Sequence, residues 1–177
     1  MMTMNKLIYP DMAFYSRDCL EAAPDLVGKL LIRTLPDMTL TLRITETEAY
    51  RGEEDTACHA SKGRTPRTEM LYREAGTIYV YLCYGIHNMM NIITGIKDQP
   101  QGVLIRACEV YDGPGKLTKK LMIDRTLNGQ SILRNPSLAV ADDGFRPRII
   151  TKKRVGIDYA TEEYRNKLWR FCAAPDE

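Results

Sequence analysis

Apolar and polar positions alternate in the first third of the chain, which predicts a β-hairpin. Residues 29–35 are mostly apolar, and a Pro-Asp pair then indicates a turn. In the next segment, residues 40–50, the side chains of Leu40, Leu42 and Ile44 fall on one face of an extended chain and polar side chains on the other. Such alternation is typical of an antiparallel strand with one buried face.

Short apolar segments separated by turn residues continue through the chain and predict a single α+β domain, residues 1–177. Further strands are expected at residues 77–84, 88–94, 102–108 and about 148–155. Short helices are expected at residues 17–22 with Ser16 as N-cap, from Pro24 to about residue 29, and at residues 115–122. Because strands do not alternate with long helices, we expect a curved antiparallel sheet with helices around it.

Composition and charge are those of an ordinary globular protein of 177 residues. The 25 basic and 23 acidic side chains leave a net charge of +2, which excludes a strongly basic tail but not a local basic patch. The longest strongly apolar run, residues 79–84, is too short to span a membrane, and residues 1–11 lack a signal-peptide pattern, so we expect a cytoplasmic protein. Five cysteines without a CxxC pair and only two histidines predict neither a disulfide framework nor a metal site.

Two glutamates give the first indication of chemistry. The parity of the apolar face in residues 40–44 continues through Glu46, Glu48 and Tyr50. A buried carboxylate is costly unless it is hydrogen-bonded or functional, and burial raises its pKa toward the range that suits a general acid or base. The alternative is that the strand leaves the core near Thr45 and both glutamates are solvated. The spacing alone leaves both interpretations open.

Aromatic and basic residues are compatible with nucleic-acid binding. Tyr79 and Tyr81 share one face of their strand, and Tyr84 precedes Gly85 at a hairpin end, where an aromatic ring can wedge into a base stack. His59 lies in a polar loop, as either a surface histidine or a ligand-facing imidazole. Three clusters offer phosphate contacts or, alternatively, solvated faces: Lys62, Arg64, Arg67 and Arg73; residues 113–116 with Lys119 and Lys120; and Arg146, Arg148, Lys152, Lys153 and Arg154.

A series of short motifs resembles the alkyladenine (3-methyladenine) DNA glycosylase family. In chain order they are TETEAY at 45–50, ED at 54–55, HAS at 59–61, GRTPR at 63–67, YVY at 79–81, YGIH at 84–87, Asn91, VLIRA at 103–107, GPGKLT at 113–118, NG at 128–129, RVGI at 154–157 and WRF at 169–171. The motifs extend over nearly the whole chain. The resemblance implies a mixed domain with a curved antiparallel sheet and a protruding hairpin that inserts into DNA.

The resemblance also implies an activity and a role for each matching residue. A monofunctional glycosylase would flip 3-methyladenine, 7-methylguanine, hypoxanthine or ethenoadenine out of the duplex, hydrolyse the N-glycosidic bond and leave an abasic site. Glu48 would activate water, which Arg106 and the backbone carbonyl of Val155 would help to hold. The base pocket would comprise Tyr50, His59 and Tyr81 as stacking partners, Asn91 as a barrier to 2-amino purines, Ala57 and Leu104. The DNA contacts would be Tyr84, filling the gap in the stack, with Ile86, His87, Arg64, Arg67, Lys116 and Lys119.

The resemblance also implies that the protein uses no metal or organic cofactor. Its expected partner is double-stranded DNA containing damaged purines. We expect a monomer. The sequence departs from the family pattern at Glu74 and Ala75, before Gly76. It also has Thr68 and Glu69 where a positive charge is more usual, which removes that charge near the expected DNA face.

Two other classes of function compete with the glycosylase. One is a module that binds modified bases without cutting, and the other is a small-molecule enzyme on a similar sheet. The presence of Glu48, Arg106 and Asn91 together favours the enzyme over the binding module. The sequence lacks P-loop, GxGxxG, HExxH and GxSxG motifs. These motifs are the usual indications of nucleotide hydrolysis, dinucleotide redox chemistry, and zincin or α/β-hydrolase chemistry.

Overall fold

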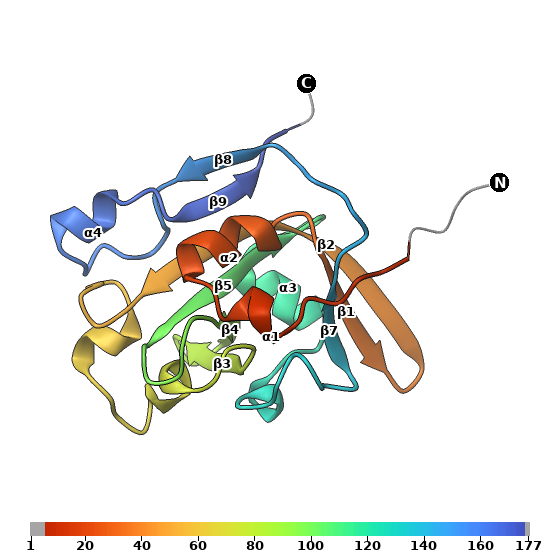
Figure 1. Cartoon of the computed structure of the whole chain (residues 1–177), viewed down its shortest axis with the longest axis horizontal. Coiled ribbons are helices and arrows are strands. Elements are labelled where there is room, and N and C mark those ends of the chain that lie inside the picture. The colour runs from red at the N-terminus through yellow and green to blue at the C-terminus, as the bar shows by residue number, and fades with distance from the viewer. Residues whose placement is uncertain (1–5, 176–177) are drawn as a thin grey trace.

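The computed structural model describes residues 6–175 and has an α+β fold around a curled, nine-stranded antiparallel sheet (Figure 1). The strands are β1 (Leu30–Leu35), β2 (Met38–Arg51), β3 (Ile78–Cys83), β4 (His87–Ile93), β5 (Gln101–Cys108), β6 (Tyr111–Asp112), β7 (Leu138–Ala141), β8 (Ile149–Lys152) and β9 (Arg170–Ala173). The main path runs β3-β4-β5-β2-β1-β7, with β6 added to β5 and the β8–β9 pair added to β2. The predicted fold class is confirmed.

Short helices surround the sheet. They are α1 (Met12–Tyr15), α2 (Cys19–Leu26), α3 (Pro114–Lys120) and α4 (Glu162–Asn166), with single 3₁₀ turns η1 (His59–Lys62), η2 (Glu69–Tyr72) and η3 (Arg125–Leu127). Two details of the prediction were wrong. Asp18 rather than Ser16 is the N-cap of α2, and Pro24 lies inside this helix instead of separating two helices. Pro24 is in the last turn of α2, where its missing N–H costs only one hydrogen bond, to the carbonyl of Leu20.

The main core lies between one face of the sheet and the helices α2 and α3. Leu26 of α2, Leu117 of α3 and Ile105 of β5 are completely buried in one cluster. The buried Thr47 on β2 also bonds to α2, because its hydroxyl donates to the carbonyl of Ala23 at 2.8 Å. This packing holds the central strands in place, and the same strands form the opposite face of the sheet. Within residues 6–175, no helix has both the length and the apolar character needed to cross a lipid bilayer.

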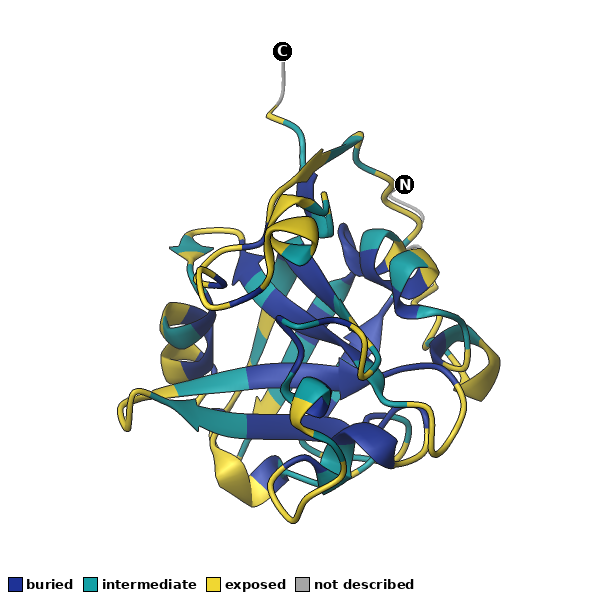
Figure 2. Ribbon diagram, turned by 90° about the vertical axis from the view of Figure 1, so that its left-hand side faces the viewer, coloured by how far each residue is buried: buried dark blue, intermediate teal, exposed yellow. Residues whose placement is uncertain are grey.

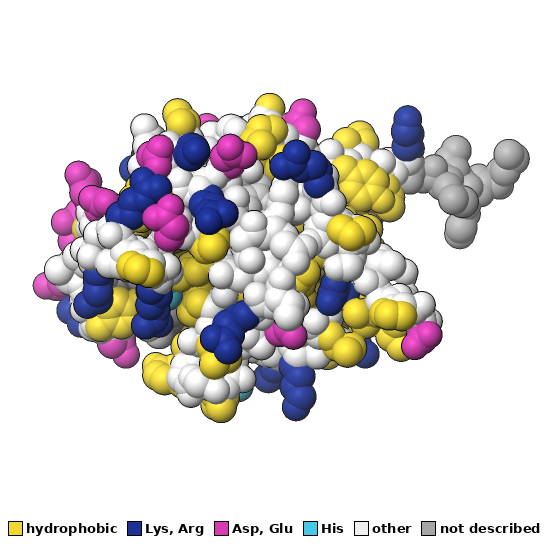
Figure 3. Space-filling view, turned by 90° about the horizontal axis from the view of Figure 1, so that it is seen from below, with side chains coloured by type: hydrophobic (Ala, Val, Ile, Leu, Met, Phe, Trp, Pro, Cys, Tyr) yellow, Lys and Arg dark blue, Asp and Glu magenta, His cyan; other side chains and the backbone are white. Residues whose placement is uncertain are grey.

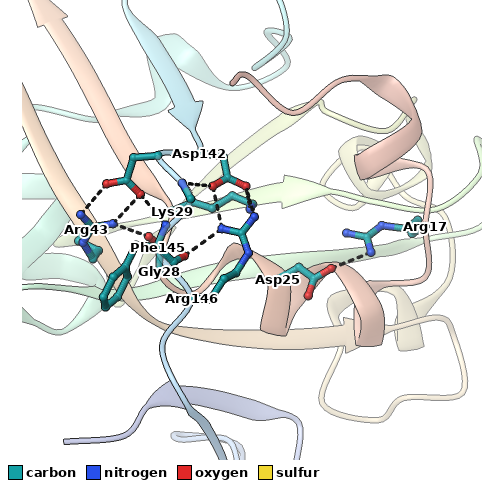
Figure 4. A network of polar contacts seen from close by, with 10 residues as sticks. Arg17, Asp25, Gly28, Lys29, Arg43, Asp142, Phe145 and Arg146 are labelled. Carbon is teal, nitrogen blue, oxygen red and sulfur yellow. Dashed lines mark hydrogen bonds and ion pairs between the residues drawn. The ribbon is translucent and has the colours of Figure 1, made fainter. Parts of the chain in front are cut away.

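A polar network ties the segment after β7 to the first hairpin (Figure 4). The carboxylate of Asp142 accepts from Lys29 Nζ at 2.6 Å and from both terminal nitrogens of Arg146 at 2.7 and 2.8 Å. Beside it, Arg43 bonds to Asp143 and lies 4.5 Å from the ring centre of Phe145. Arg146 was a candidate phosphate contact, but its charge is already paired within the fold.

The long strand β2 connects the core to the opposite face of the sheet. Its first half pairs with β1, and its second half pairs with β5 on one side and β9 on the other. The second half is therefore a central strand with its polar backbone groups satisfied on both sides. It carries the two glutamates that the sequence singles out.

Candidate active site

A bulge in β2 decides which way the two glutamates face. The register between β2 and β5 shifts between Ile44 and Glu46 and again between Glu46 and Thr47. Consequently Ile44 and Ala49 both belong to the main core although their positions have opposite parity. The predicted continuation of one buried face from Ile44 to Glu48 was wrong: Glu48 lies on the opposite face. The alternative of a solvated Glu48 was wrong too, because this residue is 0% exposed.

Glu48 borders a cavity of about 660 Å³ that gathers most of the predicted site. The catalytic and base-binding candidates at its walls are Glu48, Arg106, Val155, Tyr50, His59, Tyr81, Asn91, Ala57 and Leu104, and the DNA-contact candidates are Tyr84, His87, Arg67 and Lys116. Three predicted DNA contacts do not line it: Ile86, Arg64 and Lys119. The cavity has the size of a small-molecule site and is ample for a purine base.

Both oxygens of the Glu48 carboxylate are held by hydrogen bonds. The backbone N–H of Val155 donates to Oε1 at 2.8 Å, and the hydroxyl of Tyr50 donates to Oε2 at 2.7 Å. The guanidinium Nε of Arg106 lies 3.6 Å from Oε1, too far for a hydrogen bond but close enough for a charge interaction. Burial raises the pKa of Glu48, and Arg106, Tyr50 and Val155 offset part of that rise. Such a carboxylate is oriented and more basic than an exposed one.

The segment that carries Val155 is anchored by its neighbour Arg154. The guanidinium of Arg154 bonds to Asp55 and to the carbonyl of Ala49, and it lies 4.7 Å from the ring centre of Tyr50. The interpretation of Arg154 as a phosphate contact was therefore wrong, because this side chain is completely buried. The Val155 amide bonds to Glu48, a contact that sequence reasoning did not name, and the role of the Val155 carbonyl in holding water stays a prediction.

Aromatic side chains form one wall of the cavity. The ring centres of His59 and Tyr81 are 4.7 Å apart in an edge-to-face contact. His59 Nδ1 also lies 3.1 Å from the hydroxyl of Tyr79. Burial, with a further contribution from Arg67, lowers the pKa of His59, so the imidazole is neutral at neutral pH. Of the alternatives for His59, the structure supports the ligand-facing imidazole.

Sequence reasoning missed two tyrosines of this cavity. Tyr79 lines it beside Tyr81, and the shared parity of these two residues was a signal that pointed to it. Tyr159 also lines the cavity, and its hydroxyl donates to the carbonyl of Ala57 at 2.7 Å. No spacing or motif indicated Tyr159, because its partner lies 102 positions away in the sequence.

Asn91 is rigidly held at the cavity wall. It is 6% exposed, and its Nδ2 donates to the backbone carbonyls of Tyr79 at 3.2 Å and Met89 at 3.4 Å. Because these two bonds lie on adjacent strands, the amide group cannot rotate away without losing both. The Asn91 side chain is therefore held in one orientation at the cavity wall.

The β3–β4 hairpin projects beside the cavity, and Figure 2 shows a strand pair with a buried base and an exposed tip. Tyr84 is 90% exposed at this tip and has φ +50°, a left-handed backbone that few non-glycine residues adopt. Ile86 is 71% exposed beside it. Directly after the turn, His87 packs so tightly on Gly115 that a Cβ there would lie 2.9 Å from its Nδ1.

Basic side chains near the cavity differ in how far they are already paired. Arg64 bonds to Glu69 at 2.8 Å and to Asp98 at 2.6 Å, and it lies outside the cavity wall. Glu69 thus partly neutralises the charge of Arg64. In the view of Figure 3, Lys and Arg side chains are dispersed among acidic ones instead of forming one large patch. Contacts of Arg64 and Lys119 with DNA stay predictions.

Comparisons with known proteins show which family the chain resembles. Residues 13–177 match the sequence model of the family described as methylpurine-DNA glycosylase (MPG). A protein of Natranaerobius thermophilus named "Putative 3-methyladenine DNA glycosylase" is 42% identical, with 91% of this chain and 93% of that protein covered. Proteins of the same name from Psychrobacter cryohalolentis and Borreliella afzelii are 43% and 42% identical, covering 84% and 91% of this chain and 84% and 94% of their own.

These matches define the class of protein as a DNA glycosylase. The chain belongs to the methylpurine-DNA glycosylase family. The resemblance stated from the sequence motifs is confirmed.

Proposed function

We propose that the protein is a monofunctional glycosylase that flips alkylated or deaminated purines out of duplex DNA and hydrolyses their N-glycosidic bond. The substrate set is 3-methyladenine, 7-methylguanine, hypoxanthine and ethenoadenine, and the product is an abasic site in base excision repair. The observation that carries the proposal is the Glu48 carboxylate, which is 0% exposed and held at both oxygens at the wall of a cavity that is ample for a purine base. The partner is double-stranded DNA in the cytoplasm, bound by a single copy of the chain without a metal or organic cofactor.

Glu48 acts as the general base in this mechanism. One proton of a water molecule passes to Glu48, the water oxygen bonds to C1′ of the sugar, and the electron pair of the broken C1′–N bond leaves with the purine. Arg106 and the backbone carbonyl of Val155 hold the water. A raised pKa suits Glu48 to this role, because a more basic carboxylate accepts the proton more readily. A lyase step needs an amine nucleophile, whereas this mechanism uses a carboxylate and water.

The aromatic residues hold the flipped base by stacking. One face of the base meets Tyr50, and the other meets the His59–Tyr81 pair, whose edge-to-face contact keeps that pair in place. Stacking of this kind contributes about 1–3 kcal/mol per base, enough to offset the few kcal/mol that flipping costs. A cationic alkylpurine gains about 0.5–2 kcal/mol more from the aromatic faces. Asn91 excludes purines that carry a 2-amino group.

The projecting hairpin opens the duplex. Tyr84 enters the minor groove and fills the gap that the flipped nucleotide leaves, a use that its 90% exposure supports. Ile86 and His87 flank it, and Arg67 and Lys116 at the cavity edge contact phosphates. Arg64 and Lys119 provide further contacts. This arrangement favours a DNA enzyme over a small-molecule enzyme, which has no use for an exposed tyrosine at a hairpin tip.

The experiment that tests the proposal is a single-turnover excision assay with the wild type and Glu48→Gln. Each duplex carries one hypoxanthine, ethenoadenine or 7-methylguanine, and Glu163→Gln, a 68% exposed glutamate of α4, is the matched control. We expect abasic sites without strand cleavage, and a rate at least about 100-fold lower for Glu48→Gln. Binding of every lesion without excision by the wild type would favour a binding module, and equal rates for Glu48→Gln would overturn its role as base.

A further inference from the structure

A second carboxylate, Glu46, shares the guanidinium that faces Glu48. Glu46 Oε2 lies 3.4 Å from Arg170 Nε and 3.9 Å from Arg106 Nε, while Arg106 Nε lies 3.6 Å from Glu48 Oε1. Three strands create this chain of charges. The residue opposite Glu48 on β9 is Arg170, and the residue opposite Glu46 on β5 is Ala107, next to Arg106.

Arg106 lies at nearly equal distances from the two carboxylates. Its separations from Glu46 and Glu48 differ by only 0.3 Å, and both exceed hydrogen-bond length. The side chains of Glu46, Arg106 and Arg170 are each about one-fifth exposed, so solvent screens their charges only in part. A change in either outer residue therefore alters how closely Arg106 approaches Glu48.

We propose that Glu46 and Arg170 are positioning residues that hold Arg106 away from direct contact with Glu48. Glu46 attracts Arg106, and Arg170 limits that attraction by occupying the same oxygen of Glu46. The gap leaves the N–H groups of Arg106 free to orient a water molecule and leaves Glu48 basic. This inference rests on the proposed function of Glu48 and deepens it, because it assigns control of the base to a pair that does not touch the substrate.

The two positioning residues have opposite effects on Glu48. Replacing Glu46 by Gln removes a nearby negative charge and releases Arg106 toward Glu48, and both changes lower the pKa of Glu48. Replacing Arg170 by Gln removes a positive charge and leaves Glu46 free to pull Arg106 away, and both changes raise it. The other titratable groups that face Glu48 stay the same in both variants: Arg106, Arg154, Tyr50, Tyr81 and Tyr159.

The test is the pH dependence of single-turnover hypoxanthine excision for the wild type, Glu46→Gln, Arg170→Gln and the control Glu163→Gln. We expect the acid limb to move to lower pH by roughly one unit in Glu46→Gln and to higher pH in Arg170→Gln. The limb of Glu163→Gln stays in place. In parallel, the carbon-13 signal of the Glu48 carboxyl is titrated in each protein, and circular dichroism confirms that each variant is folded.

The two readouts separate failure of this inference from failure of the proposed function. If both variants slow excision but neither the acid limb nor the Glu48 signal moves, Glu46 and Arg170 are only structural and the inference is overturned. If the Glu48 signal moves in opposite directions but the acid limb does not follow, the positioning pair stands and Glu48 is not the base. The inference would also be overturned if the acid limb and the Glu48 signal moved in the same direction in Glu46→Gln as they do in Arg170→Gln.

Discussion

Arg154 and Asp55 form a bidentate ion pair with no solvent contact, with nitrogen–oxygen distances of 2.6 and 2.9 Å and both side chains 0% exposed. The Asp55 oxygens also accept from the backbone N–H groups of Arg51 and Ala57, each at 3.0 Å. The pair thus joins the loop after β2 to the segment whose Val155 amide holds Glu48. Removing one partner of a buried ion pair destabilises the fold, because the partner that stays behind is an uncompensated buried charge.

Asp55→Asn is therefore expected to destabilise the protein by about 3–5 kcal/mol, the usual cost of breaking a buried pair from one side. Chemical denaturation of the variant and the wild type measures it. If Asp55→Asn does not fold, Arg154→Lys tests the same point, because an ammonium cannot make both bonds of the guanidinium. Glu163→Gln breaks an exposed pair and changes stability by less than about 0.5 kcal/mol. Equal effects of Asp55→Asn and Glu163→Gln would contradict this account.

The network around Asp142 predicts how stability depends on acid. Arg146 and Lys29 lower the pKa of Asp142 in the folded protein, Arg146 contributing more than Lys29. This carboxylate therefore stabilises the fold above its ordinary pKa, near 4, and the contribution is lost as pH falls through the lower pKa of the folded state. We expect Asp142→Asn to lower Tm by several degrees at pH 7 and by progressively less in acid. Asp37→Asn, in the exposed β1–β2 turn, serves as control, and a Tm difference that does not shrink in acid would argue against the linkage.

The fold follows from the sequence where local pattern decides it. Alternation predicted the β1–β2 hairpin, and the tyrosine-rich segment with its glycine turn predicted β3 and β4. The β2 bulge was not predictable from alternation, because a bulge belongs to the pairing of two strands rather than to one. Glu48 is buried at the cavity wall, but alternation assigned its side chain to the wrong face of the sheet.

The site was less accessible to sequence reasoning because its contacts are long-range. Motifs named Glu48, Tyr50 and Asn91, which all line the cavity. The bond from Val155 to Glu48 spans 107 positions and the pair of Arg154 with Asp55 spans 99, so no local spacing encodes either. A run of basic residues also concealed that Arg154 is an internal ion-pair partner.

Asn91 predicts the exclusion of 2-amino purines. Its amide is fixed by two backbone carbonyls, so a group that clashes with it cannot push it aside. Asn91→Ser removes this obstacle, and we expect the ratio of guanine to hypoxanthine excision to rise by roughly tenfold. The ratio is measured on duplexes that differ in one base. Asn88→Ser, on the same strand but outside the cavity wall, is the matched control, and an unchanged ratio in Asn91→Ser would remove this role.

Tyr84 predicts a conflict between stability and activity. Its φ of +50° is strained for a tyrosine and well tolerated by asparagine, so Tyr84→Asn relieves roughly 1 kcal/mol of backbone strain. The same change removes the ring proposed to fill the duplex. We expect Tyr84→Asn to keep or raise Tm while it weakens binding and slows excision of lesions in duplex DNA. Tyr84→Phe keeps both the ring and the strain, so it should resemble the wild type in both measurements. A Tyr84→Asn protein with normal excision would show that the hairpin tip is strained for some other purpose than entering DNA.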